Sequence, residues 1–183
     1  MKLDDLRYPI GKDQLPEDIS KDQIEGWRET IRQFPKLVSE LVERLSASEL
    51  AYAYRPDGWN IKQVVHHCAD SHMNALTRFK LALTEDNPVI KPYKEALWAE
   101  FEDATTDDLS ASLQMLNGIH NRWYKCLSKM SGEQFERAYM HPEQNDLVPL
   151  KEALGHYDWH CRHHLAHIGQ ALQFKNEFPE LEV

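Results

Sequence analysis

The sequence has no apolar run of 18 residues, the length that a membrane-spanning helix requires. Its first nine residues are rich in charge and contain no apolar core of the kind found in secretory signals. These two absences argue against a membrane-spanning segment and against export. We therefore expect a cytoplasmic protein.

Basic residues are also scarce. The 21 lysines and arginines are outnumbered by 30 aspartates and glutamates, which gives a net charge of −9. Non-specific binding to nucleic acid requires a basic surface, and so does adhesion to an anionic membrane. We expect neither a nucleic acid nor a membrane as a partner.

Cysteine is too rare to support a disulfide framework. The chain has three cysteines, an odd number, and all of them lie inside helical patterns. We expect Cys68 and Cys161 to be small core thiols and not metal ligands, because each lies about 100° around its helix from a neighbouring histidine.

The sequence also lacks alternating strands of useful length and internal repeats. Apolar residues instead recur every three or four positions in four segments, which predicts four amphipathic helices. We expect an all-α fold, a four-helix bundle forming a single domain over residues 1–183, with a long crossover between the second and third helices. The expected helices cover residues 20–46, 60–84, 105–130 and 149–176, and the crossover covers 87–104.

Two of these helices have a clear beginning in the sequence. Ser20 is followed three residues later by Gln23, and Asn60 by Gln63, which is the spacing of a capping box. Pro35 falls inside the first helix. We expect a kink or a restart there, since proline lacks the backbone N–H of a helix interior.

Histidine is the residue type that the sequence has in excess. Ten are present, and five of them fall between Gly155 and His167 in the fourth helix. Residues four apart lie on one face of a helix, so His160 and His164 can point at a single cation. An imidazole pair at this spacing is typical of zinc and similar divalent metals.

The second helix offers a third ligand. His67 shares a polar stripe with Ser71, Asn74 and Arg78, whereas His66 lies well off that stripe. His67 is therefore the better candidate of the two.

In the third helix, His120 lies among apolar residues and is expected to point inward. Two interpretations are open for it: a residue that contacts the metal site or the substrate, or a hydrogen-bonded core histidine.

Two histidine motifs carry a resemblance to a known family. The segment Asp57–His72, in which Trp59 precedes His67 by eight residues, resembles the first signature of the DinB/YfiT superfamily. The segment His160–Ile168 resembles the second signature, with two metal histidines four apart. Segments that resemble the YfiT branch in particular are Arg78–Glu85, Ile90–Tyr93 and His120–Trp123, and the likeness covers nearly the whole chain.

The resemblance implies a four-helix bundle, a homodimer, and a divalent metal on His67, His160 and His164. Members of the family are described as metal-dependent hydrolases or as thiol S-transferases that use bacillithiol, mycothiol or glutathione. Many members have glutamine where this chain has His167, which leaves the surroundings of the ligands open.

Three neutral imidazoles leave a divalent ion with its full charge and an open position. Such an ion activates water for hydrolysis or a thiol for substitution. The protease motif His-Glu-x-x-His, with its general base, is absent, which favours a thiol. His163 or His167 could accept the proton, and so could Asp70.

Three functional hypotheses therefore remain. The leading one is a thiol S-transferase that uses a bacillithiol-like thiol against electrophiles, with one zinc or nickel ion per chain. The alternatives are a hydrolase and a non-catalytic metal-binding stress protein. The residues expected to contact the substrate are Asn74, Arg78, His120, Trp59 and Tyr93.

Overall fold

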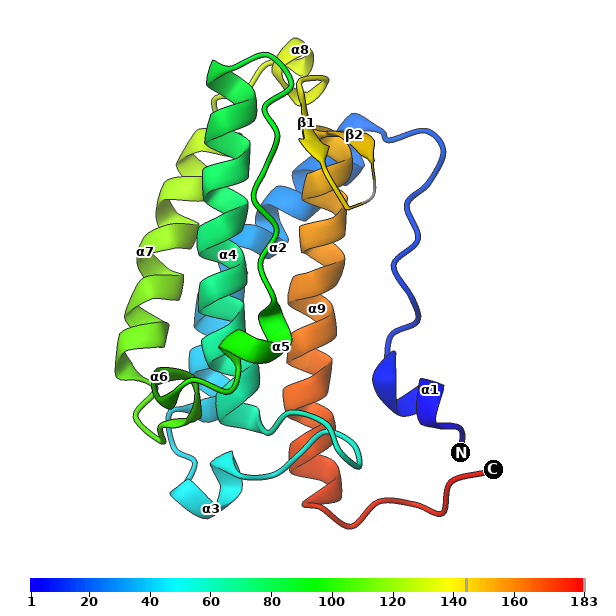
Figure 1. The fold of residues 1–183 in the computed structure, drawn as a ribbon, viewed down its shortest axis with the longest axis vertical. Coiled ribbons are helices and arrows are strands. Elements are labelled where there is room, and N and C mark those ends of the chain that lie inside the picture. Colours follow the sequence, from blue (N-terminus) through cyan, green and yellow to red (C-terminus); the bar gives the residue numbers. More distant parts are fainter. Residues whose placement is uncertain (144, 183) are drawn as a thin grey trace.

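Four long helices form the body of the protein (Figure 1). The structure is a computed structural model that describes residues 1–143 and 145–182. The expected all-α bundle is confirmed. The long helices are α2 (Lys21–Val42), α4 (Ile61–Thr84), α7 (Ser110–Leu127) and α9 (Leu150–Phe174).

Both predicted capping boxes are present. The Ser20 hydroxyl accepts the backbone N–H of Gln23, and the Gln23 side chain accepts the backbone N–H of Ser20. Asn60 and Gln63 form the same reciprocal pair at the start of α4. The expected restart at Pro35 is not found, because α2 continues without interruption from Lys21 to Val42.

The crossover between α4 and α7 runs back along α4, so α7 begins at the same end of the bundle as α4 (Figure 1). It contains two short helices, α5 (Glu95–Trp98) and α6 (Glu102–Thr105). The helix predicted to start at residue 105 begins instead at Ser110. Thr106 has an extended backbone, and the Asp108 side chain accepts the backbone N–H of Ser110.

The structure also contains a small hairpin that was not predicted from the sequence. β1 (Ala138–His141) pairs antiparallel with β2 (Asp146–Pro149), with His141 opposite Asp146. β1 also bonds to the crossover, because the N–H of Met140 donates to the carbonyl of Pro88 at 2.9 Å. Pro149 therefore ends a strand and immediately precedes α9, outside its first turn. The remaining short elements are α1 (Leu3–Arg7), α3 (Ala47–Leu50) and α8 (Gly132–Phe135).

The apolar core lies between the four long helices. Phe34, Phe79 and Trp123 come from three of them and are fully buried, and Phe79 meets Trp123 edge to face with ring centroids 5.2 Å apart. Cys68 and Cys161 are buried as expected. In the part of the chain that the structure describes, no helix combines the length and apolar character needed to cross a membrane. Three residues of the polar stripe of α4, His67, Ser71 and Arg78, contact side chains of α9, and this contact positions the candidate site.

Candidate metal centre

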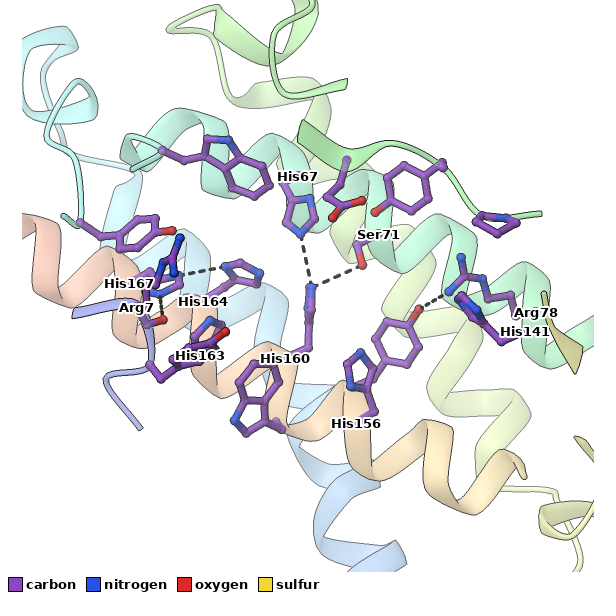
Figure 2. Close-up of a pocket in the computed structure, with 18 of the residues that line it drawn as sticks. Arg7, His67, Ser71, Arg78, His141, His156, His160, His163, His164 and His167 are labelled. Atoms are coloured by element: carbon purple, nitrogen blue, oxygen red, sulfur yellow. Dashed lines mark hydrogen bonds between the residues drawn. The ribbon is translucent and has the colours of Figure 1, made fainter. Parts of the chain in front are cut away.

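Three buried histidines converge between α4 and α9. His67 comes from α4, and His160 and His164 come from successive turns of α9 (Figure 2). One ring nitrogen from each lies within 4.8 Å of the others, and Nε2 of His67 is 3.4 Å from Nε2 of His160. A tetrahedral site with metal–nitrogen bonds of about 2.0–2.1 Å places its ligand nitrogens about 3.4 Å apart. The three side chains therefore fit a divalent metal ion.

Burial keeps these three histidines in the form that can bind metal. It lowers the pKa of His67 to about 4, and it places the pKa values of His160 and His164 well below their usual range, with neighbouring histidines as a further cause. The charged imidazolium is disfavoured in a site with little water. Each ring is therefore neutral near pH 7 and has a lone pair available for an ion.

His66 lies apart from the cluster, as its place off the polar stripe predicted. Its Nδ1 lies 2.7 Å from the hydroxyl of Ser112, and its Nε2 lies 3.1 Å from the carbonyl oxygen of Thr106. His66 thus ties α4 to the start of α7.

The three histidines open into a cavity of about 660 Å³. Of the expected substrate contacts, Trp59, Tyr93 and Arg78 line it. Asn74 and His120 do not. The Asn74 amide donates to the carbonyl of Asp70 in its own helix, and His120 is buried in the core among aromatic rings. Asn74 and His120 therefore lie outside the wall of this cavity.

Two of the three candidate proton acceptors, His163 and His167, line the cavity in different surroundings, whereas Asp70 does not line it. His163 stacks on Trp159 with ring centroids 4.3 Å apart, and its Nδ1 has no hydrogen-bond partner among the described residues. Burial lowers its pKa to about 4. His167 has partners for both nitrogens: Nε2 lies 3.0 Å from the carbonyl oxygen of Arg7, and Nδ1 lies 3.4 Å from Nδ1 of His164.

The N-terminal segment, residues 6–13, forms part of the cavity wall and was not predicted to do so. Arg7 and Tyr8 line the cavity. Side chains of α9 hold the segment, since Trp159 donates to the carbonyl of Gly11 at 3.0 Å and Gln170 donates to that of Leu6 at 2.9 Å. These contacts join residues about 150 positions apart, so no local pattern could reveal them.

Further residues of the cavity wall were missed, among them Arg55, Glu95, His141 and Glu143. These four come from a turn, the crossover and the hairpin. The two glutamates matter most, because neither was predicted and both bring a carboxylate to the cavity that contains the histidine cluster. A carboxylate in the cavity can hold a proton or a cationic group of a substrate.

The sequence matches the family model of the DinB superfamily over residues 30–168. The chain belongs to the DinB superfamily. A relative from Bacillus subtilis, named "Putative metal-dependent hydrolase YfiT", is 45% identical to this DinB-superfamily chain over 163 residues, 89% of this chain and 92% of the relative. A relative from Bacillus cereus with the same functional name is 44% identical over 166 residues, 91% of this chain and 95% of the relative.

Solved structures give the same assignment for the fold. The structure of YfiT from Bacillus subtilis, described as a probable metal-dependent hydrolase with an unusual four-helix bundle topology, superposes with a TM-score of 0.90 at 42% identity. The superposition covers 94% of this DinB-superfamily chain and 98% of that one. A mycothiol-dependent maleylpyruvate isomerase shares the fold, with a TM-score of 0.63 at 16% identity over 80% of this chain and 60% of that one. The histidine cluster and the metal-dependent relatives together indicate a metal centre.

Proposed function

We propose that this protein is a metal-dependent S-transferase that joins a low-molecular-weight thiol to an electrophile. His67, His160 and His164 would hold one divalent ion, with zinc and nickel as the favoured metals. A cation on three neutral imidazoles would favour the thiolate over the thiol. The cavity, at about 660 Å³, lies within the range of small-molecule sites.

The main support for this proposal is the position of Arg78. Its guanidinium is half-buried at the cavity wall and donates to the Tyr157 hydroxyl at 3.4 Å (Figure 2). Among the described residues it forms no ion pair with a carboxylate. An arginine left without an acid partner at a cavity wall suits a carboxylate on the ligand, which it can bind bidentately. We therefore propose that the thiol substrate carries a carboxylate group, as bacillithiol does.

His163 is the proposed proton acceptor. Its Nδ1 is buried at the cavity wall without a partner, and the neutral ring has a lone pair on one nitrogen. With a pKa of about 4, the ring would hold the thiol proton only briefly before passing it to water in the open cavity.

The second candidate function is that of a hydrolase, and the position of Glu95 favours it. This glutamate lines the cavity from the crossover helix α5. A carboxylate beside a metal centre can act as the general base for water, which is the part that the missing His-Glu-x-x-His motif would have supplied. The names of the relatives agree with this alternative.

The test begins with the metal content of the purified protein. Product formation from a chlorodinitrobenzene is then measured with and without bacillithiol or glutathione, and hydrolysis of an activated ester is measured without thiol. Stoichiometric metal with thiol-dependent product supports the transferase. Product without thiol, abolished by Glu95→Gln, replaces it with the hydrolase. Metal without turnover of either kind leaves the non-catalytic metal-binding role.

A pair of arginine variants tests the proposed substrate contact. Arg78→Gln should raise the KM for the anionic thiol about tenfold while the metal content stays unchanged, since one charge-assisted contact is lost. Arg122→Gln is the matched control, because Arg122 is exposed on α7 and does not line the cavity. Equal effects from both variants would remove Arg78 from the binding site.

A further inference from the structure

A chain of histidines leads from the metal centre into the core. Nδ1 of His160 lies 3.1 Å from Nε2 of His72, and Nδ1 of His72 lies 2.8 Å from Nε2 of His120. Nδ1 of His120 lies 2.5 Å from the backbone carbonyl oxygen of Ile31. All three rings are buried, His72 completely so. The chain thus links α9, α4, α7 and α2 in a single row of hydrogen bonds.

The far end of this chain is a carbonyl that a proline has left free. In an α-helix the carbonyl of Ile31 would accept the N–H of the residue four positions later, which here is Pro35. Proline has no N–H, so the helix supplies no donor from that position. The ring of His120 donates to this carbonyl instead. Pro35 and His120 are therefore complementary features of two packed helices.

The Ile31 carbonyl determines which nitrogen donates and which accepts in each hydrogen bond of the histidine row. An oxygen of this kind only accepts, so Nδ1 of His120 must carry a proton. In a neutral ring Nε2 is then an acceptor, and Nδ1 of His72 must donate to it. The same reasoning places the next proton on Nδ1 of His160, which leaves the lone pair on its Nε2. That atom faces Nε2 of His67 at 3.4 Å, in the metal centre.

Burial keeps the rings neutral, as this reasoning requires. An imidazolium in the row would be a buried charge, and no carboxylate is hydrogen-bonded to any of the three rings in the part of the chain that the structure describes. The neighbours are aromatic: Phe34 packs on both His72 and His120, and Trp123 packs on His72. With each ring neutral, one arrangement of protons satisfies all three hydrogen bonds.

We propose that His72 and His120 are positioning residues for the metal centre, which hold His160 as its Nδ1–H tautomer with the Nε2 lone pair directed at the ion. Partners of this kind orient a ligand and raise its basicity. The inference rests on the proposed metal site, but it is independent of whether the reaction is thiol transfer or hydrolysis.

The tautomers can be read directly by nitrogen NMR. Long-range proton–nitrogen correlation on histidine-labelled full-length protein should assign the proton of His72, His120 and His160 to Nδ1, both without metal and with one equivalent of zinc. A proton on Nε2 of His160 or His72 in the metal-free protein would overturn the proposal. If the protein binds no zinc, the metal centre and the proposed function fail, while the metal-free spectrum still decides the histidine chain.

Zinc affinity provides the second readout. His72→Leu should weaken zinc binding about 10- to 100-fold in competition with a chromogenic chelator, because the partner of His160 is lost. His66→Leu is the matched control: it also removes a buried, doubly hydrogen-bonded histidine from α4, but one with no link to the cluster. The control should change zinc affinity less than twofold.

A variant of the next histidine in the row keeps the proposal testable if His72→Leu fails to fold. His120→Leu removes no partner of His160 directly, yet it should release the tautomer of His72, so both Nδ1–H and Nε2–H forms of His160 should appear in its spectrum. Unchanged zinc affinity in His72→Leu, or an equal loss in His66→Leu, would contradict a positioning role.

Discussion

Acid should destabilise the metal-free protein, and the buried histidines set the size of the effect. Burial lowers the pKa of His67 and of His120 to about 4, against 6.5 for an exposed histidine. Because the folded-state pKa is the lower one, the unfolded chain takes up protons first as the pH falls below 6.5. Stability is therefore retained above about pH 6.5 and lost as the pH falls towards 4.

The magnitude follows from proton linkage. Between pH 7 and pH 5.5, each of these two groups removes about 1.2 kcal/mol from the free energy of unfolding, so together they remove about 2.5 kcal/mol. That is a large share of the 5–15 kcal/mol typical of a folded domain. The pKa values of His72, His160 and His164 lie further below the usual range, so the observed loss should exceed this figure.

Urea unfolding in the presence of a chelator, repeated across this pH range, measures the loss. His120→Leu is the internal comparison and should reduce it by about 1.2 kcal/mol, because one buried neutral histidine is gone. A stability that stays flat between pH 7 and pH 5.5, or the same loss in His120→Leu, would refute the account of buried neutral imidazoles.

Three further outcomes follow from the structure. Replacing any one of the three ligand histidines by alanine should lower the bound metal measured by plasma emission, and full retention in all three variants would remove the metal assignment. Gly155→Ala should lower the free energy of unfolding by about 1–3 kcal/mol, since the added Cβ would lie 2.6 Å from a Leu15 carbon and 2.8 Å from a Trp27 carbon; a thermal melt checks this. Pro35→Ala offers the Ile31 carbonyl a second donor and should shift the His120 Nδ1 proton resonance, whereas an unchanged resonance would separate the proline from the histidine chain.

Much of the candidate metal centre was predictable from helical periodicity. The spacing of His160 and His164, and the stripe that contains His67 but not His66, depend only on the geometry of single helices. The start of α4 was also predictable, because the Asn60–Gln63 capping box forms within four residues. These features are local, so the sequence around each residue is enough to place it.

The features that were missed depend on contacts between distant segments. β1 and β2 have four residues each, and β1 also bonds to the crossover near Pro88, so the hairpin depends on its neighbours. The start of α7 was predicted too early because the carbonyl of Thr106 is used by His66, some 40 residues away. Glu95 reaches the cavity only because the crossover lies against α4.

The position of His120 depends both on local sequence pattern and on contacts between distant segments. Periodicity placed it on the inward face of its helix, but its partner depends on the register between α7, α4 and α2. Its bond to the Ile31 carbonyl also gives a partner to the group that Pro35 leaves unpaired inside α2. A proline inside a helix costs about 3 kcal/mol, partly through the carbonyl it leaves unpaired, and His120 supplies the missing donor. Pro35 would weaken α2 if the helix stood alone. In the bundle it leaves a carbonyl that binds the first of three hydrogen-bonded histidines, and this row extends to the candidate metal centre.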